Sequence, residues 1–257
     1  MSLAGRTVLL TRDPAQSSEF ILEAERLGAL VLPFPTIAIA APDSWMECDR
    51  AIGGIAGYTA LAFTSANAVR WFCGRCGTLG LPAERLRSLK VYAVGVQTGG
   101  ELEQRGLTIA PVPERYSASA LADAFGSADL RGQRFLIPQG NLAREELGRR
   151  LAALGAEIDA IIVYRTLPVV PPDAESVWQV FAANGIDVVV FASPSAALAF
   201  AEVYPAGRLG TLSDRAAVAV IGPTTERAVR DLGWKPVVVA GDSTMPGLLR
   251  AIELYFR

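Results

Sequence analysis

The chain has 257 residues, of which 51% are hydrophobic and 19% charged, and its formal net charge is −2. This composition excludes a disordered chain, and the charge argues against a nucleic-acid-binding protein that relies on a broad basic surface. The longest apolar runs are of strand length, so we expect no membrane span, no signal peptide and a location in the cytoplasm. This length is typical of two domains of ordinary size.

In chain order, short apolar segments alternate with amphipathic ones. The predicted strands are 7–11, 30–34, 60–64, 91–95, 108–112, 134–138, 158–164, 188–192, 217–222 and 236–240. The predicted helices are 17–27, 66–72, 97–105, 145–154 and 224–232. Because the strands are apolar throughout rather than alternating, they are typical of parallel sheets covered on both faces. The sequence therefore predicts an α/β fold with two flavodoxin-like, doubly wound units.

Three blocks of the sequence occur twice, in the same order. Residues 5–11 correspond to 132–138, residues 62–68 to 190–196, and residues 92–98 to 219–225, each pair 127 or 128 residues apart. An internal repeat of this kind predicts two similar domains. The cleft between two such domains is the first place to look for a ligand site.

Proline-rich crossings occupy corresponding places in the two repeats, at 32–42 and 167–172, and are typical of linkers. Two layouts fit this spacing. Either the domains meet near residue 127, or residues 1–36 fold together with 172–257 while residues 40–166 form an inserted domain. In the second layout the linkers are residues 36–40 and 166–172. Spacing alone does not decide between the two.

The chain contains no histidine, which removes the commonest general acid or base and the commonest metal ligand. Its cysteines are Cys48, Cys73 and Cys76. The last two have redox or zinc spacing, but no second pair or histidine completes a tetrahedral site. The pair also follows the predicted helix at 66–72, whereas a thioredoxin-like pair precedes one. We predict incidental thiols at a helix end and no metal site.

Polar loops follow the predicted strands at the sheet edges where doubly wound folds bind ligands. They are residues 11–13, 64–67, 95–98, 139–141, 192–195 and 222–225. Most lead directly into a helix, where free backbone N–H groups, a hydroxyl and the positive end of the helix dipole form an anion site. The same residues serve as N-caps, which is the simpler interpretation of any one loop. Taken together, the loops favour a ligand with several anionic groups.

Tyr164 ends the second strand of the second repeat, immediately before a linker. A tyrosine at such a place is typical of half-buried packing, with the hydroxyl in contact with water. In a chain without histidine it is also one of few candidate proton donors. The residue by itself leaves both interpretations open.

Over essentially its whole length the chain resembles the uroporphyrinogen-III synthase family. The motifs that carry the resemblance are Leu10-Thr11-Arg12, Phe63-Thr64-Ser65-Ala66-Asn67-Ala68-Val69, Gly140-Asn141 with Arg144-Glu145, Val163-Tyr164-Arg165-Thr166, Phe191-Ala192-Ser193-Pro194-Ser195 and Ile221-Gly222-Pro223-Thr224-Thr225. The resemblance implies two flavodoxin-like domains joined by a two-stranded linker. One domain would be built from both chain termini, which favours the inserted-domain layout.

The resemblance also implies an activity, that of a hydro-lyase without a cofactor. Such an enzyme cyclises hydroxymethylbilane, a linear tetrapyrrole with eight carboxylates, with loss of water and inversion of the last pyrrole ring through a spiro intermediate. Tyr164 matches the family's tyrosine that assists departure of the hydroxyl. The residues that match substrate-binding positions are Arg12, Thr64, Ser65, Asn67, Thr98, Asn141, Arg144, Ser193, Thr224 and Thr225. Asp13, which interrupts the family's usual Thr-Arg-Pro, could pair with Arg12 and reduce its use for substrate.

Two other functions compete with this one. A non-catalytic binding or regulatory module with two domains could hold an anionic small molecule in the same cleft. An enzyme for nucleotides or sugar phosphates is less favoured, because the chain has neither a P-loop nor a dinucleotide fingerprint. We expect a small-molecule substrate, no nucleic acid, no membrane and a monomer. The sequence leaves open whether the preceding pathway enzyme hands over the bilane by transient contact.

Overall fold

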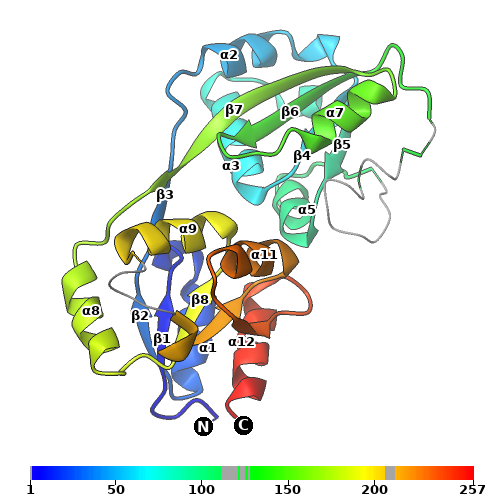
Figure 1. Cartoon of the computed structure of the whole chain (residues 1–257). Coiled ribbons are helices and arrows are strands. Elements are labelled where there is room, and N and C mark those ends of the chain that lie inside the picture. The colour runs from blue at the N-terminus through cyan, green and yellow to red at the C-terminus, as the bar shows by residue number, and fades with distance from the viewer. Residues whose placement is uncertain (1, 111–120, 122–124, 127, 206–211) are drawn as a thin grey trace. The chain divides into compact units, whose positions relative to one another are not determined.

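The structure, a computed structural model, describes residues 2–110, 121, 125–126, 128–205 and 212–257. The chain divides into two compact units (Figure 1). Unit 1 consists of Met1–Ala38 and Leu167–Arg257, and unit 2 consists of Ile39–Thr166. Each unit has its own five-stranded sheet.

The sheet of unit 1 has the order β10-β9-β8-β1-β2, and all its neighbouring strands are parallel. The strands are β1 (Thr7–Leu10), β2 (Leu30–Pro33), β8 (Val188–Phe191), β9 (Ala217–Val220) and β10 (Pro236–Val239). The helices are α1 (Ser18–Arg26), α8 (Ala174–Ala182), α9 (Pro194–Val203), α11 (Pro223–Asp231) and α12 (Met245–Tyr255), with 3₁₀ turns η1 (Pro14–Gln16) and η3 (Leu212–Asp214). One core holds buried residues of α8, α9 and α11, and the other holds those of α1 and α12. The sheet is therefore covered on both faces, as its apolar strands predict.

The sheet of unit 2 has the order β3-β7-β6-β4-β5. The strands are β3 (Ile37–Ala40), β4 (Ala60–Phe63), β5 (Lys90–Ala93), β6 (Arg134–Gly140) and β7 (Glu157–Pro168). The helices are α2 (Met46–Gly53), α3 (Ala66–Thr78), α4 (Ala83–Arg87), α5 (Val96–Glu103) and α7 (Glu146–Ala153), with the 3₁₀ turn η2 (Ile55–Gly57). Helices α2, α3 and α5 contribute to one core and α7 to the other.

Each unit combines strands from both repeats. In unit 1, β1 and β2 come from the first repeat and β8, β9 and β10 from the second. In unit 2, β6 and β7 come from the second repeat and β4 and β5 from the first. Numbered within the repeat, the strands of unit 1 follow the order 2-1-3-4-5 of flavodoxin-like folds, and β7-β6-β4-β5 follows the same order. The predicted α/β fold with parallel sheets is confirmed.

The expected linker segment at 36–40 forms strand β3, which neighbours β7, and β7 continues to Pro168. Three expectations differ from the structure. The predicted strand at 108–112 is reduced to a single bridge between Ile109 and Val91 among the described residues, and 111–112 lie outside them. Helix α3 continues past residue 72 to Thr78, because the buried Cys76 extends its core-facing side. The cysteine pair therefore lies inside α3, and its expected place after the helix is wrong.

Candidate functional site

The carboxyl ends of β4 and β6 mark the point in unit 2 where the strand order reverses, and this is where doubly wound sheets bind ligands. Ser65 follows β4, and Gly140 ends β6. The Ser65 hydroxyl accepts a hydrogen bond of 3.1 Å from the backbone N–H of Ala68 and so caps α3. The capping interpretation of this loop is confirmed.

Tyr164 meets Ser65 at this edge. The two hydroxyl oxygens are 3.2 Å apart, and either can donate the hydrogen bond. A β-bulge in β7 brings them together, since Gln139 pairs with Ile162 whereas Gly140 pairs with Tyr164, so that β7 contains one extra residue at this step. The Tyr164 ring packs against the core that α3 helps to form, on the same side of the sheet as Ser65.

Unit 1 has a related arrangement at the ends of β1 and β8. The buried Thr11 hydroxyl donates a hydrogen bond of 2.7 Å to the carbonyl oxygen of Val190. Ser193 caps α9 by accepting from the N–H of Ala196 at 3.2 Å, as Ser65 does for α3. Here the second hydroxyl is that of Ser195, 3.1 Å from Ser193, in place of a tyrosine.

The loops after β5 and β9 begin their helices differently. Helices α5 and α11 have glycine N-caps, Gly95 and Gly222, and neither has a side-chain capping hydrogen bond. At Gly95 the φ angle of 88° favours glycine, because a Cβ atom is disfavoured there. Thr98 and Thr225 are buried in the first turns, whereas Thr224 is exposed. Apart from Pro223, which has no N–H group, the first turns of both helices thus offer backbone N–H groups to an anion.

Several predicted contact residues already have partners in the protein. The exposed Asn141 donates to the Thr166 carbonyl and accepts from the Thr166 N–H at 2.7 Å, so it fastens β6 to β7. The amide oxygen of Asn67 accepts from Arg70 at 3.2 Å. Thr64 is partly buried at the end of β4. Arg144 is exposed and has neither a hydrogen bond nor an ion pair with the described residues.

The loop after β1 contains the pair Arg12 and Asp13. The Asp13 carboxylate accepts a hydrogen bond of 2.9 Å from the N–H of Ala15 and caps η1. Arg12 contacts the side-chain oxygen of Gln16 at 3.4 Å. Asp13 therefore has a local structural role in the turn that follows β1.

Sequence reasoning missed one polar loop at the carboxyl edge of unit 1. Ser243 follows β10 and has a φ of 52°, a left-handed conformation that is uncommon for a residue other than glycine. A Cβ atom at Gly222 would overlap the Ser243 hydroxyl, so the loop after β10 lies against the loop after β9. The string Gly241-Asp242-Ser243-Thr244, directly before α12, was the signal that could have identified it.

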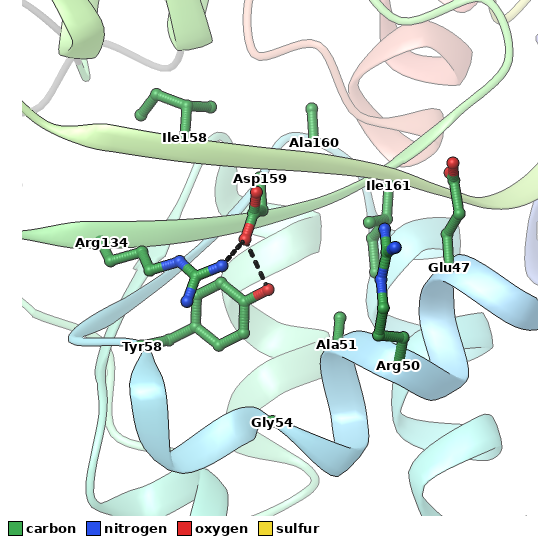
Figure 2. Close-up of a pocket in the computed structure, with 10 residues that line it drawn as sticks. All are labelled: Glu47, Arg50, Ala51, Gly54, Tyr58, Arg134, Ile158, Asp159, Ala160 and Ile161. Carbon is green, nitrogen blue, oxygen red and sulfur yellow. Dashed lines mark hydrogen bonds and ion pairs between the residues drawn. The ribbon is translucent and has the colours of Figure 1, made fainter.

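A pocket of about 410 Å³ lies elsewhere in unit 2, between α2, η2 and the amino-terminal part of β7. It is lined by Glu47, Arg50, Ala51, Gly54, Tyr58, Arg134, Ile158, Asp159, Ala160 and Ile161. Figure 2 shows the Asp159 carboxylate directed at the Tyr58 hydroxyl and the Arg134 guanidinium, which donate to it at 2.7 and 2.6 Å. Burial and this hydrogen bond raise the pKa of Tyr58 to about 12, and the same hydrogen bond lowers the pKa of Asp159. No sequence motif predicted this pocket.

The pocket is at the opposite end of the strands from Tyr164. Arg134 is the first residue of β6, and Asp159 is near the start of β7. Ligands of doubly wound sheets bind at the carboxyl ends, so the pocket is a poorer candidate for the active site than the edge at Ser65 and Tyr164. We interpret the Tyr58–Asp159–Arg134 cluster as a structural fastening of η2 to the sheet.

Comparison with known proteins identifies the family. The family model described as uroporphyrinogen-III synthase HemD matches residues 18–250. The chain belongs to the uroporphyrinogen-III synthase family. Members of this lyase family act in the tetrapyrrole pathway. The uroporphyrinogen-III synthase of Chlorobaculum parvum is 31% identical over 248 residues, which cover 96% of this chain and 98% of that protein. The one from Synechococcus elongatus is 31% identical over 266 residues, covering 99% and 97%.

Solved structures of uroporphyrinogen-III synthases share the fold. A mutant enzyme from Thermus thermophilus superposes with a TM-score of 0.70 at 21% identity, covering 98% of this chain and 100% of that one. The Helicobacter pylori protein gives a TM-score of 0.61 at 16% identity, with the same coverage. At such identities the likeness concerns the fold alone.

The cysteines of this uroporphyrinogen-III synthase fold are poorly suited to nucleophilic chemistry. Burial raises the pKa of Cys48 and Cys76 to about 12 and that of Cys73 to about 11. Thiols with such values stay protonated at neutral pH and react slowly. Within the described residues no group of three potential metal ligands occurs. Nor does any helix of the described residues have the length and apolarity to cross a membrane.

Proposed function

We propose that this chain converts hydroxymethylbilane into uroporphyrinogen III and that Tyr164 is the proton donor for loss of the hydroxyl. The observation that supports this role most is the position of the Tyr164 hydroxyl. It lies 3.2 Å from Ser65 at the carboxyl ends of β4 and β6, where the strand order reverses. Among the residues that match the family, Tyr164 alone combines this place with an acid group.

The reaction needs one proton transfer to begin. When Tyr164 donates its proton, the substrate's hydroxyl leaves as water. The pyrrole that carried the hydroxymethyl group, at the other end of the bilane from the last ring, becomes an electrophilic azafulvene. The substituted carbon of the last ring attacks it and forms the spiro intermediate. That intermediate fragments, and the last ring closes again through its other carbon. The proton which this carbon loses replaces the one that Tyr164 gave, so the net change is loss of water.

Ser65 has a supporting role in this scheme. Its oxygen already accepts the N–H of Ala68 at 3.1 Å, which leaves its own proton free to point at Tyr164. While Tyr164 lacks its proton, the Ser65 hydroxyl can donate a hydrogen bond to the phenolate oxygen. A fixed donor of this kind stabilises developing charge without rearrangement during the reaction.

The substrate's carboxylates would bind at the carboxyl edge of each sheet. The N-termini of α5 and α11 are the best candidates, because no side chain caps them and Thr98, Thr224 and Thr225 lie in their first turns. Arg144 adds an exposed guanidinium. Arg12, Thr64, Asn67, Asn141 and Ser193 are weaker candidates, since most of them already hold local structure.

The proposed chemistry requires neither a metal nor an organic cofactor, because the pyrrole nitrogen of the substrate shares the positive charge of the azafulvene. The protein contributes mainly by holding a flexible chain in the conformation that favours spiro closure. We also propose that the protein is a monomer and that it is located in the cytoplasm. Membership of the synthase family favours this enzyme over a non-catalytic binding module.

The test is to add freshly made hydroxymethylbilane, oxidise the product and separate type I from type III uroporphyrin by chromatography. The bilane also cyclises unaided to type I, so a reaction without protein is the control. A predominance of type III with protein supports the proposal. Formation of type I alone, at the spontaneous rate, would contradict it and favour the binding module.

A further inference from the structure

We infer that Gly140 is a positioning residue, whose missing side chain allows Tyr164 to reach Ser65; this inference rests on the proposed role of Tyr164. A Cβ atom at Gly140 would lie 2.5 Å from Cζ of Tyr164 and 2.8 Å from both Cε2 and the hydroxyl oxygen. Carbon atoms that are not bonded approach each other to about 3.5–4.0 Å. The ring therefore occupies the space that any other residue at position 140 would fill.

The usual reason for a glycine does not apply at this position. Gly140 has no positive φ, whereas nine other glycines in the described part of the chain, Gly95 among them, do. Its backbone conformation is open to any residue, and it is the last residue of β6, paired with Tyr164 after the bulge in β7. The tyrosine ring is the feature that excludes a side chain here.

The strand register explains why the ring lies over Gly140. Leu136 of β6 contributes to the core on the α3 side, so the alternation of β6 directs position 140 to the same side. The bulge in β7 places Tyr164 opposite Gly140, and the ring packs against that core. Its hydroxyl then reaches Ser65, the N-cap residue of α3.

This arrangement predicts how an added methyl group would act. The methyl group of an alanine at position 140 would push the ring away from β6, and the hydroxyl would leave its place beside Ser65. A displacement of about 1 Å can cost roughly 100-fold in rate when it misplaces a reacting group. Other residues would bind the substrate's carboxylates, so the affinity for substrate would change little.

The first experiment measures type III formation by the full chain carrying Gly140→Ala. We expect kcat to fall at least tenfold and KM for hydroxymethylbilane to change less than threefold, both rough figures from the cost of misplacement. Gly74→Ala is the matched control, since Gly74 lies in α3 of the same unit and a Cβ atom there would meet nothing within 4 Å. Wild-type kcat in Gly140→Ala would overturn the inference.

A double-mutant cycle separates positioning from a general structural effect. Once Tyr164→Phe has removed the hydroxyl, adding Gly140→Ala should lower kcat no further, because both changes act through the same group. Losses that multiply would overturn the inference. Normal turnover in Tyr164→Phe alone would instead remove the proposed role of Tyr164, whatever Gly140→Ala does, so the two failures are distinguishable.

Thermal unfolding tests the steric part, even where Gly140→Ala folds poorly. Overpacking against the ring should lower the Tm of Gly140→Ala. Shortening the tyrosine should remove this effect, so that Gly140→Ala costs no Tm when it is added to Tyr164→Ala. An equal loss of Tm in both backgrounds would show that the ring is not the obstacle and would overturn the inference.

Discussion

The hydroxyl groups of Ser65 and Tyr164 lie 3.2 Å apart, although the two residues are 99 positions apart in the chain. Ser65 belongs to the first repeat and Tyr164 to the second, and the sheet of unit 2 joins them because it contains strands of both. Ser65 also caps α3. A single hydroxyl thus connects the start of a helix with the proposed proton donor.

Replacing Ser65 by alanine should affect both stability and rate. Loss of the cap of α3 should destabilise the protein by about 0.5–2 kcal/mol. Loss of the hydrogen bond to Tyr164 should also lower kcat. Ser193→Ala is the matched variant, because Ser193 caps α9 at nearly the same distance but contacts Ser195 instead of a tyrosine. We expect similar losses of stability in urea unfolding and a clearly larger fall in kcat for Ser65→Ala. Equal kcat values for Ser65→Ala and Ser193→Ala would argue against the supporting role proposed for Ser65.

Arg144 should contribute to substrate binding rather than to the chemical step. Arg144→Ala should raise KM for hydroxymethylbilane and leave kcat nearly unchanged, as expected when a contact is equally strong in the bound substrate and the transition state. Arg149 provides the control, since it is also exposed but lies further along, within α7, away from the carboxyl end of β6. A KM that is the same in Arg144→Ala and wild type would exclude a carboxylate contact at this residue.

The Tyr58–Asp159 pair should make stability depend on pH at the alkaline end. The pKa of Tyr58 rises from 10.0 to about 12, through burial and the hydrogen bond to Asp159. The unfolded chain therefore loses this proton at lower pH than the folded chain. The contribution of Tyr58 is fully present below pH 10 and is lost as the pH rises through the window to about 12.

The measurement for this pair is the Tm of wild type and Tyr58→Phe on both sides of that window. The advantage of wild type over Tyr58→Phe should be larger at neutral pH than near the upper end of the window. Tyr255→Phe, at an exposed tyrosine, is the control and should show no such change. An advantage that does not vary with pH would contradict the prediction. In acid, the lowered pKa of Asp159 predicts that its contribution is lost as the pH falls below about 3.8.

The thiols should be unreactive in the folded protein. A thiol reagent such as dithionitrobenzoate should label Cys73, which is partly exposed, slowly, and should label the buried Cys48 and Cys76 only after unfolding. The physical reason is that burial keeps all three protonated. The control is the same reaction in urea. Labelling of all three cysteines in native buffer at the rate seen in urea would show that the assignment of incidental thiols is wrong.

The apolar pattern predicted most strands to within one or two residues, and helices α1, α5, α7 and α11 equally closely, for example a helix at 17–27 where the structure has Ser18–Arg26. It gave no bounds for helices α2, α4, α8, α9 and α12. It ended α3 too early because Gly74 and Gly77 weaken the helical pattern, while packing of Cys76 against the core overrides them. The exchange of strands between the repeats could not be deduced from spacing, because the same repeat fits separate or interleaved sheets.

The sequence indicated the residues of the candidate site, but it did not indicate the contacts that these residues make in the structure. Ser65 and Tyr164 were both named from the sequence, but their contact depends on a bulge of one residue in β7, and no sequence pattern specified it. Asn141 was assigned to substrate although its side chain bonds to the backbone of Thr166, a contact set by strand register. The fastening of Tyr58 to Asp159 joins residues 101 positions apart, which local reasoning does not connect.

The most direct test of the proposed mechanism is the rate of type III formation in Tyr164→Phe. Phenylalanine keeps the ring over Gly140 and removes only the hydroxyl. Since general acid catalysis contributes roughly 100- to 10,000-fold, we predict a fall in kcat of at least tenfold, with the affinity for hydroxymethylbilane nearly unchanged. Type III formation at the wild-type rate in this variant would contradict the proposed role of Tyr164.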